Sequence, residues 1–385
     1  MNASRQQSYG GARFRYFGFS LAACVLAGAG CNQKLEPYDP QLKYELRTDP
    51  VISAIPANTP TKDDLPRHGK IDEYLRDLPK LGGKVLDPKA LTDPQRATLQ
   101  QLLEDRFGTP SAPKNPTVEP DLGLDAATLA KGSASYRVRC TQCHGISGDA
   151  RGPTGPWIFP YPRDFRTGQF KRSTSTVSNG KPGFDDLVHN LRAGVPGTSM
   201  PMFDLLPPED LNALASYVIH LSIRGEVELR LMRELLSEDG NAEDVTKVFD
   251  VQYARVLREW KSARAGRLPE FVPGDSNGDS IRRGHALFTS AGCIACHASY
   301  GNTESFRFDI WGFPNAVTNL RQPERKWGGE PHELARTIRQ GIPPANMPAA
   351  ALKDRDLGDL VNFLRALPHQ AQLPEDVRSS VEGAR

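Results

Sequence analysis

The 385-residue sequence lacks several features that would indicate common functions. Lys and Arg together number 48 and Asp and Glu number 46, so no excess of one charge points to nucleic acid or another polyanion as a partner. We find no catalytic triad, phosphate-binding loop or acid/base pair. The uncharged run 16–30 is about five residues shorter than the roughly 20 that a membrane-spanning helix needs.

Cysteine is also scarce, and its positions leave no pair for a network of structural disulfides. Of the six cysteines, two lie near the N-terminus and four lie in the motifs CTQCH at 140–144 and CIACH at 293–297. Two cysteines three residues apart, with a histidine directly after the second, form the attachment pattern of c-type haem. The thiols would form thioethers with the haem vinyl groups, and the histidine would ligate the iron.

Two other uses of these cysteines fit less well. A redox-active dithiol has no need of the adjacent histidine. A zinc site built from all four cysteines would join pairs about 150 residues apart, whereas the usual separation is about 15 to 20. The motifs therefore predict two covalently bound haem c groups, held by Cys140, Cys143 and His144 and by Cys293, Cys296 and His297.

The N-terminus has the pattern of a signal peptide, predicted over residues 1–30, because arginines precede the uncharged run. A cysteine after an apolar, small-residue stretch resembles the lipobox of bacterial lipoproteins. We favour Cys31 as the lipidated residue; Cys24 is the alternative, and its preceding Leu-Ala-Ala fits a lipobox better. Ordinary cleavage that releases an unlipidated protein is the third possibility. Lipidation would hold the protein on the periplasmic side of a bacterial membrane.

Residues 31–125 are rich in proline and polar side chains, and we expect an irregular extension with one helix. Thr92 is a predicted N-cap, Pro94 lies in the first turn, and an apolar series runs to Phe107 before Gly108. The stretch 108–120 reads as an extended spacer. The segment would serve as a tether.

The two motifs belong to an internal duplication. A glycine and an aromatic residue precede each first cysteine at nearly helical spacing, and the glycine would allow another helix to approach closely. Leucine-rich stripes at 211–221 and 357–364 predict that second helix in both halves. Between motif and final helix, 187–201 aligns with 334–348, and each segment ends in Met-Pro.

Both halves resemble class I c-type cytochromes, in which a helix leads into CxxCH, a loop brings a Met-Pro ligand, and a final helix crosses the first. The resemblance implies a mainly α fold with two haem domains at 126–222 and 275–368. A helical linker at 223–274 would pack the two domains together, with its turn at 238–241. A polar tail would follow at 369–385.

The resemblance also implies further site residues. Met200 and Met347 would be the second axial ligands of the two irons, with Met202 the alternative to Met200 in the first domain. A carbonyl from Pro156, or from Pro153, would accept a hydrogen bond from the second nitrogen of the proximal histidine.

Other side chains are expected near the haems. Forked guanidinium groups suit carboxylates, so the candidates for pairing with haem propionates are Arg163, Arg166, Lys171 and Arg321. Arg192 and Arg339 each close a helix, which favours a cation without any haem contact. Tryptophans at 157, 311 and 327 would supply core. Histidines at 68, 189, 220, 285, 332 and 369 are expected at the surface, with His189 placed just before the first Met loop.

These features favour a di-haem, membrane-attached cytochrome that passes electrons between other redox proteins, and they favour an electron carrier over a stand-alone catalyst. A di-haem enzyme, such as a peroxidase or a thiosulfate-oxidising cytochrome, is the first alternative. It would need one iron open to substrate, which the paired Met-Pro loops argue against. A haem subunit of a larger oxidase or reductase complex is the second.

Overall fold

We describe the protein from a computed structural model, which covers residues 35–175, 180–237, 242–265, 271–325 and 328–384. The chain divides into two compact units, Met1–Leu35 and Glu36–Arg385, and every element described below lies in the second. The predicted signal peptide, both candidate lipidation cysteines and Trp327 lie outside the described residues.

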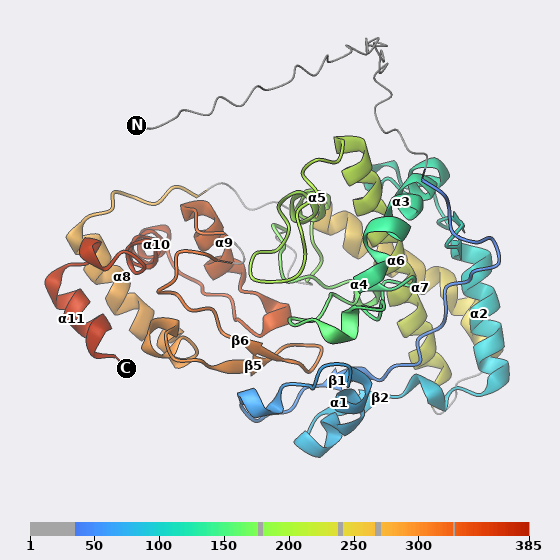
Figure 1. Ribbon diagram of the computed structural model, residues 1–385, viewed down its shortest axis with the longest axis horizontal. Helices are drawn as coiled ribbons and strands as arrows, with labels where there is room; N and C mark the ends of the chain where they lie inside the picture. The colour runs from blue at the N-terminus through green and yellow to red at the C-terminus, as the bar shows by residue number, and fades with distance from the viewer. Residues whose placement is uncertain (1–34, 176–179, 238–241, 266–270, 326–327, 385) are drawn as a thin grey trace, which may run out of the picture. The chain divides into compact units, whose positions relative to one another are not determined.

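The fold is mainly helical, as predicted (Figure 1). Its helices are Ile71–Asp77 (α1), Asp93–Phe107 (α2), Ala126–Arg139 (α3), Thr141–His144 (α4), Phe184–Ala193 (α5), Pro208–Leu235 (α6), Ala242–Ala265 (α7), Gly278–Ser290 (α8), Pro331–Gln340 (α9), Asp354–Ala366 (α10) and Glu375–Gly383 (α11). Three two-stranded antiparallel sheets pair Val51–Ala54 (β1) with Lys84–Leu86 (β2), Gly108–Thr109 (β3) with Ala112–Pro113 (β4), and Phe306–Phe308 (β5) with Pro314–Ala316 (β6).

Each motif follows a helix that crosses a second helix at a glycine, as the duplication predicts. Helix α3 packs on α6, and α8 packs on α10. A Cβ atom added at Gly132 would collide with the carbonyl oxygen of Ala213, and one added at Gly284 would collide with that of Asp359. The two backbones approach so closely that only glycine fits.

The second helix of the first haem domain continues beyond residue 221, where the leucine-rich stripe predicted its end. The predicted helix at 211–221 and the first part of the predicted helical linker form one continuous helix, α6. Helix α7 packs against α6 and α2, and its residues Val245, Phe249, Val256 and Trp260 join the same core. The helices of the predicted linker therefore extend the first domain's core, and its last described part packs on the second domain through Phe271. Its predicted turn at 238–241 is outside the described residues.

The N-terminal extension is packed along its described length, in contrast to the expected tether. Helix α2 begins and ends as predicted, with a capping box at Thr92 and a positive φ at Gly108. The Tyr44 and Tyr217 hydroxyls lie 2.8 Å apart within the core. The expected spacer after Gly108 forms the β3–β4 hairpin, and the carbonyl of Pro110 in its turn accepts a hydrogen bond from buried Ser133. Prolines here terminate short elements without excluding them from the core.

The C-terminal segment is not the polar tail that its composition predicts. Helix α11 covers the second domain, and Leu373, Val377 and Val381 are at most 2% exposed. Spacing of four residues places these three apolar side chains on one face of an otherwise charged segment. Among the described helices, none combines the length and the apolar character needed to cross a membrane.

Candidate haem-binding site

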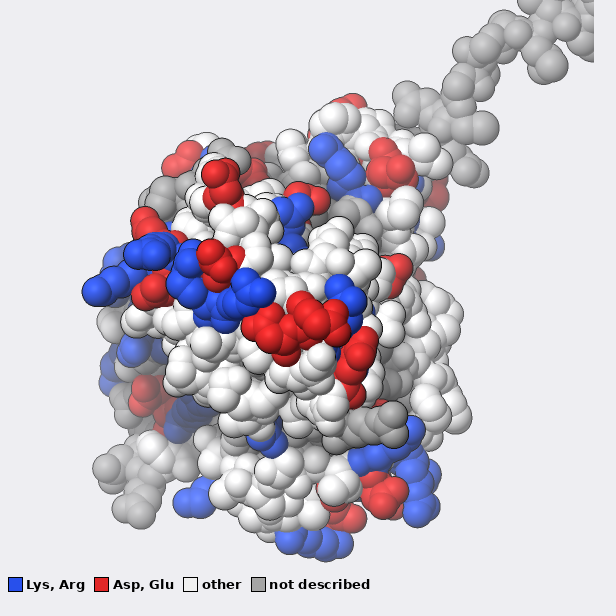
Figure 2. Space-filling model, turned by 90° about the vertical axis from the view of Figure 1, so that its left-hand side faces the viewer, with Lys and Arg blue, Asp and Glu red and all other residues white. Residues whose placement is uncertain are grey.

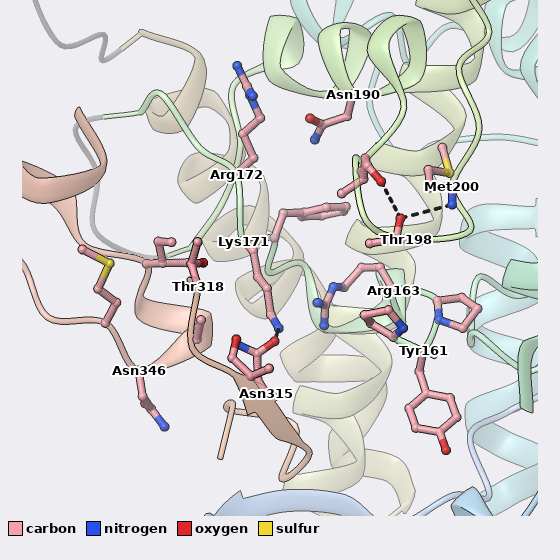
Figure 3. Close-up of a pocket in the computed structure, with 18 of the residues that line it drawn as sticks. Tyr161, Arg163, Lys171, Arg172, Asn190, Thr198, Met200, Asn315, Thr318 and Asn346 are labelled. Carbon is pink, nitrogen blue, oxygen red and sulfur yellow. Dashed lines mark hydrogen bonds between the residues drawn. The ribbon is translucent and has the colours of Figure 1, made fainter. Parts of the chain in front are cut away.

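One cavity of about 440 Å³ brings together the predicted ligands of both repeats. Its walls include the complete predicted set: Cys140, Cys143, His144, Met200, Cys293, Cys296, His297 and Met347. Figure 3 shows Met200 on one side of this space and Thr318 and Asn346 of the second repeat on the other, with Arg163 and Lys171 between them. The sequence suggested two sites, and the fold joins them into one continuous space.

The first motif is shaped by the end of α3. Cys140 caps that helix, and its carbonyl accepts hydrogen bonds from the backbone of Cys143 at 3.1 Å and of His144 at 2.8 Å. This turn places both thiols and the imidazole on the cavity wall. Burial lowers the pKa of His144 to about 4, which keeps the ring neutral at physiological pH. A neutral imidazole is the form that ligates iron.

A backbone carbonyl orients each histidine. The Nδ1 atom of His144 donates to the carbonyl of Arg163 at 3.0 Å, and that of His297 donates to the carbonyl of Thr318 at 3.2 Å. Since Nδ1 donates, Nε2 keeps its lone pair for a metal. Burial lowers the pKa of His297 as well.

The proline prediction for this hydrogen bond was wrong. The carbonyl of Pro156 instead accepts from the backbone of Gly69 at 2.8 Å. The ring of His144 reaches a residue 19 positions downstream, after Pro162, and His297 reaches one 21 positions downstream. The offsets are therefore similar in the two repeats, and neither uses a proline carbonyl.

The two Met loops have the same geometry. Helices α5 and α9 end at Gly194 and Gly341, with φ/ψ of 65°/−166° and 68°/−167°. The next amide then bonds to the methionine carbonyl, Val195 to Met200 at 3.2 Å and Ile342 to Met347 at 2.9 Å. Only glycine adopts this backbone conformation readily, so it fixes where each loop turns toward the cavity.

The structure separates the two candidate methionines of the first repeat. Met200 lies on the cavity wall and packs against the core. Met202 is 62% exposed and does not line the cavity. The position of Met200 therefore fits the role of a ligand better.

Comparison with known proteins agrees with this geometry. The family model for cytochrome c matches residues 129–222 and again 281–368. Two regions of the chain are thus similar to cytochrome c domains, and we refer to them by that name. Such domains bind haem c covalently and serve electron transfer, which is the chemistry that these two regions support.

The other comparisons add little. No curated protein matches the sequence. A solved chain of the reducing HAO-like protein complex of Kuenenia stuttgartiensis is 20% identical, with a TM-score of 0.45, over 62% of this chain and 95% of that one.

The cavity suits haem in its donors and its lining. Each cytochrome c domain contributes two thiols, a histidine with a free Nε2 and a thioether, which is the donor set of a His/Met haem c. The remaining walls are largely apolar and include Phe165, Leu187, Leu191, Val218 and Ile338. A flat macrocycle needs this combination of apolar contact and two axial donors.

The cations predicted to pair with propionates fall into two groups. Arg163 and Lys171 line the cavity, and Arg172, which was not singled out, lies beside them. Arg166 does not line the cavity, because its guanidinium is held 2.9 Å from the carboxylates of both Asp49 and Asp164. Arg321 in the second cytochrome c domain donates to the backbone carbonyls of α11. The prediction was therefore wrong for Arg166 and Arg321.

Other predicted residues also differ in their placement. Trp311 is 9% exposed and lines a second cavity, not the one with the ligands, whereas Trp157 is 64% exposed and contributes no core. His189 is exposed, as expected, whereas His220 is fully buried beside the rings of Tyr217 and Phe107. No sequence pattern marked His220 as buried, because α6 is buried on every side from Ala213 to Glu228 and these residues include polar and charged ones.

Proposed function

We propose that the protein relays electrons between redox partners through two haem c groups that share one internal space. The observation that carries this proposal is the single cavity lined by both CxxCH motifs and both Met-Pro loops. Haem c supplies the one-electron iron couple; the protein supplies ligation, orientation and exclusion of water. Two cofactors bound in this one cavity would be able to exchange electrons directly, without an intervening carrier.

The ligand pairs are His144 with Met200 and His297 with Met347. In each domain a neutral imidazole, buried at His144 and part-buried at His297, is held by a backbone carbonyl, and a thioether reaches the same cavity from a loop that turns at a glycine. With two protein ligands, each iron would have no open position for a substrate. This favours the carrier over a peroxidase or a thiosulfate-oxidising enzyme.

Localisation and partners extend the proposal. We place the protein on the periplasmic side of a bacterial membrane, held by lipid on Cys31 or, in the alternative, on Cys24. Mass spectrometry of the mature N-terminus tests this, since an unlipidated terminus contradicts it.

The partners would be other redox proteins, in transient contacts or within a larger complex. Figure 2 shows Lys and Arg beside Asp and Glu on the face of the second domain, so this face offers both signs of charge to a partner. Co-purification with a large complex would favour the subunit role.

The ligation is tested by a pair of methionine variants. Met200→Ala should lower the reduction potential of one haem and produce a high-spin ferric signal, because a soft thioether favours ferrous iron. Met202→Ala, two residues away and exposed, is the matched control and should leave the spectrum and both potentials unchanged. Optical spectra recorded during a potentiometric titration measure both properties, and a pyridine haemochrome assay gives the number of haems.

The result of this pair decides the proposal. A spectrum changed only in Met202→Ala would transfer the ligand role to Met202. A haem that is already high-spin in the unaltered protein would contradict the closed irons and give priority to the enzyme.

A further inference from the structure

Arg163 connects the proximal histidine of the first domain to the second domain. Its backbone carbonyl accepts the Nδ1 hydrogen bond of His144 at 3.0 Å. Its guanidinium carbon lies 3.3 Å from the centroid of the Trp311 ring, which belongs to the second domain. One residue thus holds a haem ligand with its main chain and a neighbouring domain with its side chain.

The second domain holds Trp311 firmly. Trp311 lies in the turn between β5 and β6, where one carboxylate oxygen of Asp309 accepts from the backbone of Trp311 and of Phe313, each at 3.1 Å. The indole nitrogen donates to the Thr167 hydroxyl of the first domain at 3.2 Å. Lys171 of the first domain pairs with the other oxygen of Asp309 at 3.2 Å. The indole is therefore fixed from both domains.

The charge of Arg163 is partly withdrawn from water. Its side chain lines both the haem cavity, where Figure 3 labels it, and a second cavity of about 630 Å³. Burial lowers the pKa of Arg163 to about 10, so the group is still protonated at neutral pH. Asp309 and Asp164 are the acidic groups that oppose this charge. A partly buried charge acts over a longer range than a fully solvated one, because less solvent screens it.

We propose that Arg163 is a positioning residue through which the second domain raises the reduction potential of the first haem. The inference rests on the proposed function. A cation near the iron disfavours the ferric state, and the stacked indole keeps that cation in place. At the second haem the equivalent carbonyl belongs to Thr318, which carries no charge. A charged residue therefore holds the proximal histidine in the first domain and not in the second.

The test requires the two haems to be distinguished. Met347→His, used as the background, should lower the second haem's potential, because imidazole favours ferric iron more than a thioether does. The higher wave of a potentiometric titration is then the first haem. If Met347→His moves no wave, the proposed ligation fails, whatever the later variants do.

Two charge variants of opposite sign follow in this background. Arg163→Gln should lower the equilibrium constant for reducing the first haem about tenfold, which is about 59 mV for one electron. Asp309→Asn should raise this equilibrium constant, because the substitution removes a negative charge that opposes Arg163. The amide oxygen of the new side chain can still accept the two backbone hydrogen bonds. Arg192→Gln, an exposed cation on α5, is the control and should shift neither wave. Shifts of the same sign from Arg163→Gln and Asp309→Asn would indicate structural damage and overturn the inference.

The indole is tested separately. Trp311→Ala should lower the same constant about threefold, in the direction of Arg163→Gln, and Trp311→Phe should restore it, since phenylalanine also stacks on a guanidinium. Thr167→Val removes the indole hydrogen bond, together with the bond from the Thr167 hydroxyl to the Asp164 carbonyl, and should have a smaller effect. If Trp311→Ala leaves the first haem's potential unchanged, or shifts both haems equally, the second domain does not act through Arg163. Circular dichroism of each variant establishes that it is folded.

Discussion

The two cytochrome c domains share the geometry around their ligands and differ in what surrounds it. Both have a helix crossing at a glycine, a histidine held by a backbone carbonyl and a methionine loop that turns at a glycine. The first domain shares its core with the extension and α7, whereas the second is completed by its own α11. The duplicated parts are those that a haem requires. The remaining parts of the two cores come from different segments of the chain.

The difference predicts two unfolding units. The buried apolar residues form one cluster around α6 and another around α10. Contacts between the domains include ion pairs, such as Lys171 with Asp309 and Arg172 with Glu333, and the ring contact of Tyr161 with Phe313, and none of these residues belongs to both core clusters. We therefore expect each domain to show its own thermal transition, which mutations can shift separately.

The largest expected effect comes from filling a helix crossing. Gly284→Val places a branched side chain against the carbonyl oxygen of Asp359, which is backbone and cannot move without displacing α10. Overpacking a tight core typically costs about 1–3 kcal/mol, and a backbone clash exceeds that range, so the second domain should lose its native fold. Calorimetry should then show only the first domain's transition. Gly132→Val should do the converse.

A matched control for this pair is available at the chain's end. Gly383→Val makes the same substitution where no atom lies within 4 Å of the new Cβ. Both transitions should persist. A Gly284→Val protein that retains two transitions would show that the second domain tolerates a wider helix crossing than the first.

Much of the fold could be predicted from the sequence because it follows local periodicity. The spacing of Gly132, Tyr136 and Cys140 indicated a helix with a close crossing, and the Thr92 capping box marked the start of α2. Two predictions that depended on composition were wrong. The charged segment after residue 369 contains three buried apolar residues in one stripe, and the Pro-rich extension gains its stability from partners far along the chain, such as Tyr217.

The ligand side chains could be predicted, but the groups that support them could not. Cysteine, histidine and methionine are recognisable by type and spacing. The carbonyls of Arg163 and Thr318 are backbone groups that any residue carries, so no side-chain pattern reports them. The contact between Arg163 and Trp311 joins residues from different domains, and it depends on how the β5–β6 turn lies against the first domain.

A smaller effect is expected from truncating the shared core of the first domain. Phe107 of α2 is fully buried, with ring centroids 6.0 Å from Phe249 and 6.1 Å from Tyr253 of α7. Phe107→Ala should destabilise the first domain by about 3–5 kcal/mol and leave the second transition in place. Val251→Ala, at an exposed position on α7, should cost less than about 0.5 kcal/mol. Equal shifts of both transitions in Phe107→Ala would mean that the two cores unfold together.

The smallest expected effect is a response to acid that differs between the domains. Burial alone would raise the pKa of Asp164. The positive charges of Arg166, Arg47 and Arg151 outweigh this effect and lower the pKa to well below the ordinary 3.8. Burial would also raise the pKa of Asp49, and the same three arginines lower it below its ordinary value. Since the folded pKa values lie below the unfolded one, these carboxylates stabilise the first domain above pH 3.8, and this contribution is lost as the pH falls.

Between pH 5 and pH 4 the two carboxylates together should cost the first domain about 0.5 kcal/mol, and the loss should grow below that range. The second domain relies on pairs such as Arg282 with Asp376, whose side chains are 48% and 59% exposed, and solvent weakens such pairs. Its transition should therefore move less. Scanning calorimetry across this pH range measures both, and Asp164→Asn should flatten the first domain's response while lowering its stability at neutral pH. An equal acid response of both transitions would show that the arginine network does not distinguish the first domain from the second.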